Sequence, residues 1–395
     1  MTAYTDQNAT GVALLRNDWI DVLRGWAAIA VVLMHLNIRV PFRDFEGAAW
    51  LSKRAYNFLF SSGWQAVMVF FVISGFLITQ AMLARWHSLD KVQPLQFYGF
   101  RVARLLPCLL GFIVLQSLLQ AWQIPGFHDA ANTTPLWRAI VSALTFHLNW
   151  LEAQHGYLPG AWDVLWSLSV EEAFYLGFPL LCLLVRSPRW LVAILCAFLI
   201  IGPYARVGMG SNEIWADHGY LSGMGEIALG CMSAMLARHW IPTGRRGIWV
   251  LVLGLVCMAL PLYFRGWVFK SGLTGLGLDM TLLALGAALV LIATHANPAW
   301  YRYASLPGIS WLRWVGRSSY EVYLCHMFVV IALVEAFRAW GGGPQMAPWL
   351  YGGALGLSLL AGHLVARYFS EPLNRLIRSR LLRGRGAAPT VAVQT

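Results

Sequence analysis

The stretch DVLRGWAAIAVVLMHL, residues 21–36, decides the fold, because it is an apolar, membrane-length run that contains one arginine and one histidine. Arg24 and His35 are eleven residues apart. That is three helical turns, so the two side chains share one face of a helix, about 16 Å apart along its axis. Ionisable groups in such a helix usually face a bundle interior or a watery cavity, and they indicate function. The alternative is that Arg24 snorkels to one membrane interface while His35 lies at the opposite headgroups.

The composition places the rest of the chain in a membrane as well. Of 395 residues, 58% are hydrophobic and only 12% are charged, and the mean hydropathy is +0.58. Soluble globular proteins carry about twice that share of charged residues. Apolar runs of spanning length occur at 19–38, 64–84, 103–121, 170–186, 190–207, 220–237, 247–264, 278–296, 316–337 and 348–369. We therefore predict an all-α, polytopic transmembrane bundle of about ten spanning helices.

An eleventh apolar run, residues 136–151, is short and contains Arg138, His147 and Asn149. It lies within a region, 122–169, that is too long for a simple connection and too aromatic for disorder. We expect a partly helical re-entrant or interfacial segment that folds back over the outer mouth of the bundle.

The basic residues then set the topology. With ten crossings and a cytoplasmic N-terminus, most Arg and Lys residues fall in inner loops and in the C-terminal tail, as the positive-inside rule requires. Four basic residues depart from this rule, because they fall in the first outer loop: Arg39, Arg43, Lys53 and Arg54. We expect a cytoplasmic segment at 1–18, a membrane domain at 19–383 and a flexible, basic, cytoplasmic tail at 384–395. The net charge of +11 then reflects a bilayer partner and not nucleic acid.

Two motifs accompany the Arg24 and His35 stripe. In FFVISGFLIT, residues 70–79, Ser74 and Gly75 either allow close helix packing or leave room for a ligand chain beside the stripe. In FRVARLLP, residues 100–107, Arg101 and Arg104 form a fork suited to phosphate groups, or serve as ordinary positive-inside anchors.

Further polar and aromatic residues are candidates for binding a substrate. Glu171 and Glu172 open a predicted helix, whose dipole accounts for only one of them. The remaining candidates are Trp162, Asp163 and Trp166 in the outer region, Glu226 in GYLSGMGEIALG, and Tyr323 and His326 in GRSSYEVYLCHMFVV. A structural hydrogen bond between Tyr323 and His326 is as consistent with their spacing as a role in binding. The six cysteines have no metal-ligand spacing, and we predict no metal site.

Six stretches together carry a family resemblance: DVLRGWAAIAVVLMH, FFVISGFLIT, RVARLLP, WSLSVEEAFYL, GRSSYEVYLCHMFVV and YFSEPL. From about residue 19 to 382 they resemble, in order, the signatures of the acyltransferase-3 family. The resemblance implies an integral membrane enzyme of a bacterial cytoplasmic (inner) membrane. Such an enzyme moves an acyl group, often acetyl, from cytoplasmic acyl-CoA to a carbohydrate hydroxyl at the other face. One position departs from the family, because Ala173 stands where the acidic motif commonly has Gln.

By the same resemblance, Arg24 and His35 correspond to the first-helix pair, Arg101 and Arg104 to the CoA side, and Glu172 to the acidic motif. The arginines would hold the CoA phosphates. His35 would deprotonate the acceptor hydroxyl or take the acyl group itself. Glu171 or Glu172 would orient that histidine or bind sugar hydroxyls, with Trp162 and Trp166 stacking on the sugar.

Two questions stay open at this stage. A transporter or flippase of a lipid-linked glycan would also use buried Arg, His and Glu, without covalent chemistry. The second question is whether such an enzyme acts alone, as a homo-oligomer or with a separate periplasmic partner.

Overall fold

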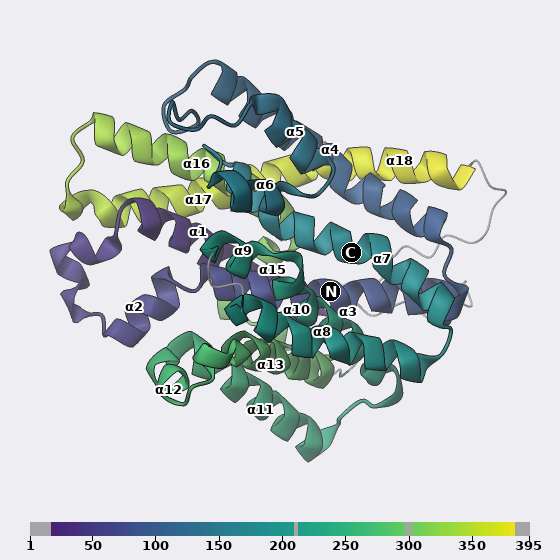
Figure 1. The fold of residues 1–395 in the computed structure, drawn as a ribbon. Coiled ribbons are helices and arrows are strands. Elements are labelled where there is room, and N and C mark those ends of the chain that lie inside the picture. Colours follow the sequence, from purple (N-terminus) through teal and green to yellow (C-terminus); the bar gives the residue numbers. More distant parts are fainter. Residues whose placement is uncertain (1–16, 209–211, 296, 298–299, 301–302, 384–395) are drawn as a thin grey trace.

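The computed structural model describes residues 17–208, 212–295, 297, 300 and 303–383. Across them the chain is helical and contains no strand, and the long helices run alongside one another in a bundle (Figure 1). The long helices are α1 (Asp18–Arg39), α3 (Gly63–Trp86), α4 (Pro94–Ala121), α7 (Leu165–Val185), α8 (Pro188–Gly208), α10 (Tyr220–His239), α11 (Gly244–Tyr263), α13 (Leu278–Thr294), α16 (Ser319–Ala339) and α17 (Ala347–Val365).

Each of the ten predicted apolar runs coincides with one of these helices. In the described part of the chain, nine helical stretches are long and apolar enough to cross a membrane. The tenth, α13, is apolar but has 17 residues, the lower limit for a span. The prediction of an all-α polytopic bundle is confirmed.

The remaining helices are short and connect or cover the long ones. They are α2 (Lys53–Phe60), α5 (Leu136–Leu144), α6 (Leu148–His155), α9 (Glu213–His218), α12 (Arg265–Lys270), α15 (Pro307–Arg317) and α18 (Glu371–Arg383), with single turns at η1 (Phe42–Asp44), η2 (Glu46–Trp50), η3 (Leu89–Lys91), η4 (Trp162–Val164), η5 (Thr274–Leu276) and η6 (Pro344–Met346).

The predicted non-spanning segment 136–151 forms α5 and α6. Phe146 lies between them with a φ of 57°, which ends one helix before the next begins. Neither helix approaches the ~20 residues that a span requires. Their apolar faces pack onto α4, α7 and α16 in a single cluster, so the segment folds back over the bundle as predicted.

Glycines set the distance between α3 and α10. A Cβ built on Gly75 would lie 2.0 Å from the carbonyl oxygen of Ile227, and one on Gly230 would lie 2.1 Å from that of Val72. Only glycine permits such an approach, which is how helices pack closely in lipid. Gly75 therefore packs helices, the first of our two alternatives, and the second, that it leaves room for a ligand, does not fit this position.

Glu226 also has a packing role. Its carboxylate accepts a hydrogen bond from Arg206 at 2.9 Å, and both side chains are buried. Arg206 donates as well to the carbonyl oxygens of Ser222 and Gly277, so the pair ties α8 to α10 and to the turn before α13. Because the ion pair occupies Glu226, the substrate-binding role that we expected for it does not fit this position.

The described chain starts and finishes at one end of the bundle. After α17 a π-helical turn (Ala366–Ser370) leads into α18, which lies beside α4 (Figure 1). Arg24, near the start of α1, and Arg378, on α18, line the same cavity. This placement agrees with an even number of crossings. The predicted terminal segments, 1–18 and 384–395, lie outside the described residues except for Asn17 and Asp18.

Candidate active site

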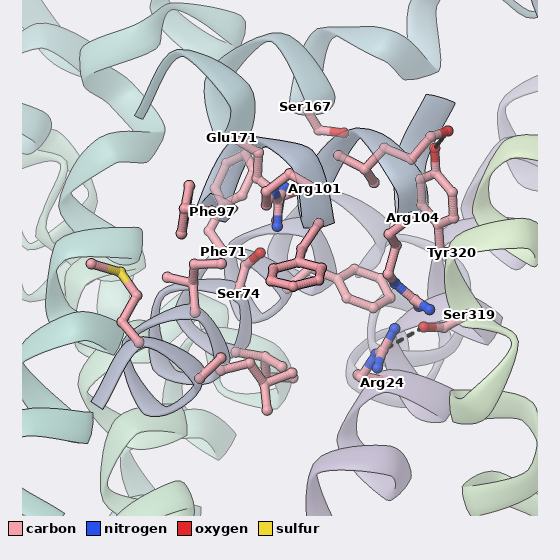
Figure 2. A pocket seen from close by; sticks show the side chains of 18 of the residues that line it. Arg24, Phe71, Ser74, Phe97, Arg101, Arg104, Ser167, Glu171, Ser319 and Tyr320 are labelled. Atoms are coloured by element: carbon pink, nitrogen blue, oxygen red, sulfur yellow. Dashed lines mark hydrogen bonds between the residues drawn. The ribbon is translucent and has the colours of Figure 1, made fainter. Parts of the chain in front are cut away.

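A cavity of about 210 Å³ lies between α1, α3, α4, α7 and α16 (Figure 2). Apolar side chains of α3 and α4 form much of its wall. Its polar lining is dominated by five arginines: Arg24, Arg85, Arg101, Arg104 and Arg378. We call this part of the cavity the arginine end.

The arginines come from four helices that the fold brings together. Arg24 is on α1, Arg85 is in the last turn of α3, and Arg378 is on α18. Figure 2 shows Arg24 and Arg104 extending toward the same side of the cavity, where Arg24 Nε donates to Ser319 Oγ at 3.0 Å. Arg85 and Arg378 lie over the Phe100 ring, at 4.0 and 5.5 Å from its centroid.

Three of these arginines lack a close ion-pair partner on any described residue, although the charge of Arg104 also acts on the buried Glu321. Arg85, Arg104 and Arg378 have no carboxylate within 4 Å in the described ranges. Guanidinium groups gathered around an apolar cavity repel one another, and an anion with several phosphate oxygens would relieve that repulsion. The arginine end is therefore suited to a polyphosphate ligand.

The fourth arginine is held by the acidic motif. Arg101 forms an ion pair with Glu172, and its guanidinium lies 3.8 Å from the centre of the Tyr175 ring. The Tyr175 hydroxyl in turn donates to Ser74 Oγ at 2.5 Å. Ser74 lines the cavity, as expected for a residue near the donor, although its hydroxyl is already bonded.

Glu171 and Glu172 are not where we expected them. Glu171 lines the cavity and Glu172 pairs with Arg101, whereas the hydrogen-bond partners of His35 are Val31 and His326. The two glutamates lie nearly two turns into α7, within reach of α4. Opposite charge across that helix pair places them near Arg101, so the expected contact of either glutamate with His35 is corrected.

Ser167 and Tyr323 also line the cavity. Their hydroxyl groups are 2.8 Å apart, and the Tyr323 hydroxyl donates to the carbonyl oxygen of Val164 at 3.0 Å. The ring centroids of Tyr323 and His326 are 5.9 Å apart, and those of His326 and His35 are 5.0 Å apart. We call these four residues the histidine end.

His35 does not itself line the cavity. The predicted stripe is present, with Arg24 in the cavity and His35 deeper along α1, but Tyr323 and His326 stand between them. His35 keeps 9% of its surface exposed, while His326 is completely buried. A ligand that fills the cavity therefore reaches Tyr323 and Ser167 first.

Backbone contacts fix the protons of the two imidazoles. His326 Nδ1 lies 2.6 Å from the carbonyl oxygen of Tyr323, and His35 Nδ1 lies 2.9 Å from that of Val31. Because a carbonyl oxygen only accepts, each neutral ring carries its hydrogen on Nδ1. His326 Nε2 is then an acceptor 3.2 Å from His35 Nδ1. This leaves His35 Nε2 unprotonated and able to act as a base.

The aromatic residues expected to stack on a sugar are packing residues instead. Trp162 has no exposed surface, and its Nε1 donates to Gln120 at 2.8 Å. Trp166 is 5% exposed, and its ring is stacked on His218 with centroids 4.2 Å apart. Neither ring offers a free face to a sugar. Asp163 is partly exposed, and its carboxylate lies 3.8 Å from His218.

Sequence reasoning missed Arg85 and Arg378 as cavity residues. Both were visible as basic residues flanking apolar runs, a position that the positive-inside rule already explains. The closing helix α18 folds against α4, and only that contact brings Arg378 into the cavity. No signal in the sequence indicates this contact.

With the geometry in place, comparison with known proteins identifies the family. A family model described as an acyltransferase domain, that of the acyltransferase-3 family, matches residues 17–367. The chain belongs to this family. The match runs from the start of α1 into the π-helical turn that precedes α18, so it contains four of the five cavity arginines and both histidines.

Curated relatives give a narrower comparison. The chain is 26% identical over 342 residues to the peptidoglycan O-acetyltransferase OatA of Listeria monocytogenes, an alignment of 79% of this chain and 49% of that protein. It is 24% identical over 386 residues to the O-acetyltransferase OatA of Staphylococcus aureus, covering 90% of this chain and 57% of the relative. The chain thus spans about half the length of the curated relatives that it matches. No solved structure matches it.

Proposed function

We propose that this protein is a membrane O-acyltransferase that moves an acyl group, acetyl in the first instance, from acyl-CoA to a carbohydrate hydroxyl. The observation that supports this most directly is one cavity lined by two chemically different sets of residues. Five arginines contribute to its lining, and Tyr323, which also lines it, leads to a pair of hydrogen-bonded histidines. Family membership and two O-acetyltransferase relatives support the same reaction class.

Acyl-CoA binds with its phosphates at the arginine end. Arg104 and Arg378, together with Arg85, supply charge-assisted hydrogen bonds where phosphate charge is best compensated. The cavity, at about 210 Å³, is smaller than a typical pocket for a whole ligand of that size. It therefore takes the pantetheine arm, while the nucleotide stays at the mouth among the arginines. To reach His35 the thioester passes Ser167 and Tyr323, which requires the Tyr323 side chain to move.

The chemistry takes place at the histidine end. The acceptor oxygen forms a bond to the thioester carbonyl carbon, and the bond from that carbon to sulfur breaks. His35 Nε2 takes the proton of the acceptor hydroxyl and returns it to the departing CoA thiolate, so charge balances over the cycle. The alternative, in which His35 carries the acyl group covalently, uses the same nitrogen. His326 holds the ring so that this nitrogen stays free of its proton.

The two substrates approach from opposite faces. In the proposed topology both termini and the arginine end are cytoplasmic, and the protein resides in a bacterial inner membrane. The relatives' names make peptidoglycan the first acceptor to test, and other cell-envelope glycans present the same hydroxyl chemistry.

The test is acyl transfer by His35→Ala. Membranes containing the wild-type protein should transfer radiolabelled acetyl groups from acetyl-CoA to envelope glycan, and the variant should lose about 10²- to 10⁴-fold in rate, as expected for a general base. His239→Ala, an exposed histidine at the end of α10, is the matched control and should retain the wild-type rate. Full transfer by His35→Ala at normal membrane levels would remove the assignment, and binding without any label transfer would favour a carrier.

A further inference from the structure

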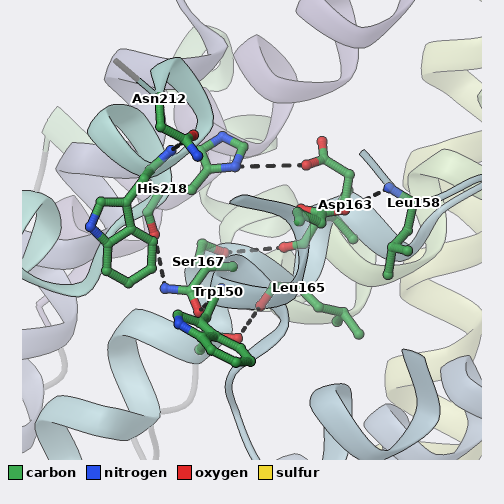
Figure 3. Close-up of polar contacts among 12 residues, drawn as sticks. Trp150, Leu158, Asp163, Leu165, Ser167, Asn212 and His218 are labelled. Atoms are coloured by element: carbon green, nitrogen blue, oxygen red, sulfur yellow. Dashed lines mark hydrogen bonds and ion pairs between the residues drawn. The ribbon is translucent and has the colours of Figure 1, made fainter. Parts of the chain in front are cut away.

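Three side chains that acyl transfer does not use converge beside α7. Glu152 of α6, Asp163 of η4 and His218 of α9 offer ligand atoms that all lie within 4.8 Å of one another. Figure 3 shows the His218 ring directed at the Asp163 carboxylate, with 3.8 Å between Nδ1 and Oδ1. Glu152 and Asp163 are eleven residues apart, and His218 follows 55 residues later; the three belong to separate short elements that the fold brings together.

Each of the three groups lacks a hydrogen-bond partner at the atom that faces the others. Glu152 is completely buried and His218 is 7% exposed. Among the described residues, Glu152 Oε2, Asp163 Oδ1 and His218 Nδ1 make no hydrogen bond. Buried polar atoms in folded proteins are nearly always paired, so three such atoms around one point indicate a missing ligand.

Neighbouring contacts hold the three side chains in place. The other oxygen of Glu152 accepts from the backbone N–H of Leu158 at 3.1 Å. The Asn149 amide donates to the carbonyl oxygen of His218 at 2.9 Å, and the Trp166 ring lies parallel to the His218 ring. Metal ligands are commonly oriented by outer contacts of this kind.

The chemistry of the three groups specifies a cation. The carboxyl groups of Glu152 and Asp163 lie close together at a largely buried point, where a second negative charge is costly. A divalent ion would remove that cost. Two carboxylates and one imidazole suit Zn²⁺ or Mn²⁺, whose ligand atoms at about 2.1 Å lie roughly 3.4 Å apart in a tetrahedral site. Small side-chain movements from the present spacing reach that geometry.

We propose that Glu152, Asp163 and His218 bind one divalent transition-metal ion, Zn²⁺ or Mn²⁺. The ion ties α6 and η4 to α9 and so fixes the segment that folds back over the bundle. Three protein ligands leave a further coordination position for water on the side of Asp163, whose side chain is 28% exposed. The site is distinct from the arginine-lined cavity, but Asp163 and His218 interact electrostatically with His35.

The test is metal content of the full-length protein purified in detergent. The protein is stripped with EDTA, reloaded with ZnCl₂ or MnCl₂, passed through a desalting column and analysed by mass spectrometry of the metal. The wild type should retain about one ion per chain, and Glu152→Gln and His218→Gln should each retain less than about a tenth of that, since three ligands are needed to close the site. Glu213→Gln and His155→Gln, exposed residues on the same two helices, should bind as the wild type does.

Thermal unfolding gives a second readout that does not depend on any activity. Added Zn²⁺ or Mn²⁺ should raise the Tm of the wild type and of both controls, and leave that of Glu152→Gln unchanged. The competing explanation is a proton shared between the Glu152 and Asp163 carboxyl groups. It predicts that Glu152→Gln unfolds no earlier than the metal-free wild type and that neither ion binds. Wild-type protein that retains neither ion and shows no shift in Tm, or equal uptake by Glu152→Gln, would overturn the proposal.

Discussion

The arginine end and the histidine end of the cavity are built in opposite ways. At the arginine end, three of five guanidiniums have no described carboxylate within 4 Å, and two of them lie over a single phenylalanine ring. At the histidine end, His35 and His326 are held by backbone carbonyl oxygens and by each other. One end carries three arginines without a close described carboxylate, and the other carries a satisfied hydrogen-bond network.

This difference separates binding from chemistry. Charge that the protein leaves unbalanced is balanced by a ligand, so the arginine end supplies affinity for an anion. A base must keep one nitrogen free of its proton and correctly placed, which the hydrogen bonds at the histidine end achieve before any substrate arrives. Changes at the two ends should therefore alter different kinetic constants, and the following variants test that separation.

The largest effect is expected from removing two arginines together. Arg104→Ala combined with Arg378→Ala should raise the KM for acetyl-CoA by about 100-fold or more, because each charge-assisted hydrogen bond contributes about 1.5–3 kcal/mol. The kcat at saturating donor should stay near the wild-type value. Arg375→Ala is the control, since Arg375 is 81% exposed on the same helix and pairs with Glu371. A fall in kcat at unchanged KM would contradict the assignment of donor binding to the arginine end.

The next effect concerns the acidic motif and is a loss of stability. Glu172→Gln leaves Arg101 without its buried partner, and we expect a loss of about 3 kcal/mol in the free energy of unfolding. Denaturant unfolding in detergent measures it. Glu371→Gln, which removes an exposed partner of Arg375, should cost less than about 1 kcal/mol. Equal losses in the two variants would show that the ion pair with Arg101 is not a special anchor of α4 on α7.

The smallest effect sharpens the assignment of His326 as a positioning residue. His326→Ala removes the acceptor for His35 Nδ1 and should lower kcat by about 10-fold, roughly the free energy of one hydrogen bond to a buried group. His326→Gln places an amide oxygen near the same position and should recover most of that loss. The KM for acetyl-CoA should not change in either variant. A raised KM, or no rescue by Gln, would contradict this role.

The positions of the long helices and the placing of Arg24 and His35 on one side of α1 could be predicted from the sequence. Each apolar run became a helix because hydropathy over about 20 residues reports directly on burial in lipid. The three-turn spacing of Arg24 and His35 also placed both on one side of α1, since helical geometry alone fixes that relation. The family resemblance assigned Arg101 and Arg104 to the CoA side, and both line the cavity.

What depended on contacts between helices could not be predicted. The sequence does not say which helix lies opposite Glu172, so its pairing with Arg101 was missed. Gly75 and Trp162 are residue types that serve packing or binding equally well, and only their neighbours show that they pack. Arg378 enters the cavity because α18 folds against α4, and the cluster around Glu152 forms from segments that share no sequence motif.

Equilibrium binding of radiolabelled acetyl-CoA tests the central claim most directly, when wild type, His35→Ala and Arg378→Ala are measured side by side. If the arginine end binds the donor and the histidine end performs the chemistry, His35→Ala will bind acetyl-CoA with the wild-type Kd. Arg378→Ala will then bind about 10-fold more weakly, as the loss of one charge-assisted contact requires. Weakened binding by His35→Ala together with unchanged binding by Arg378→Ala would contradict the account.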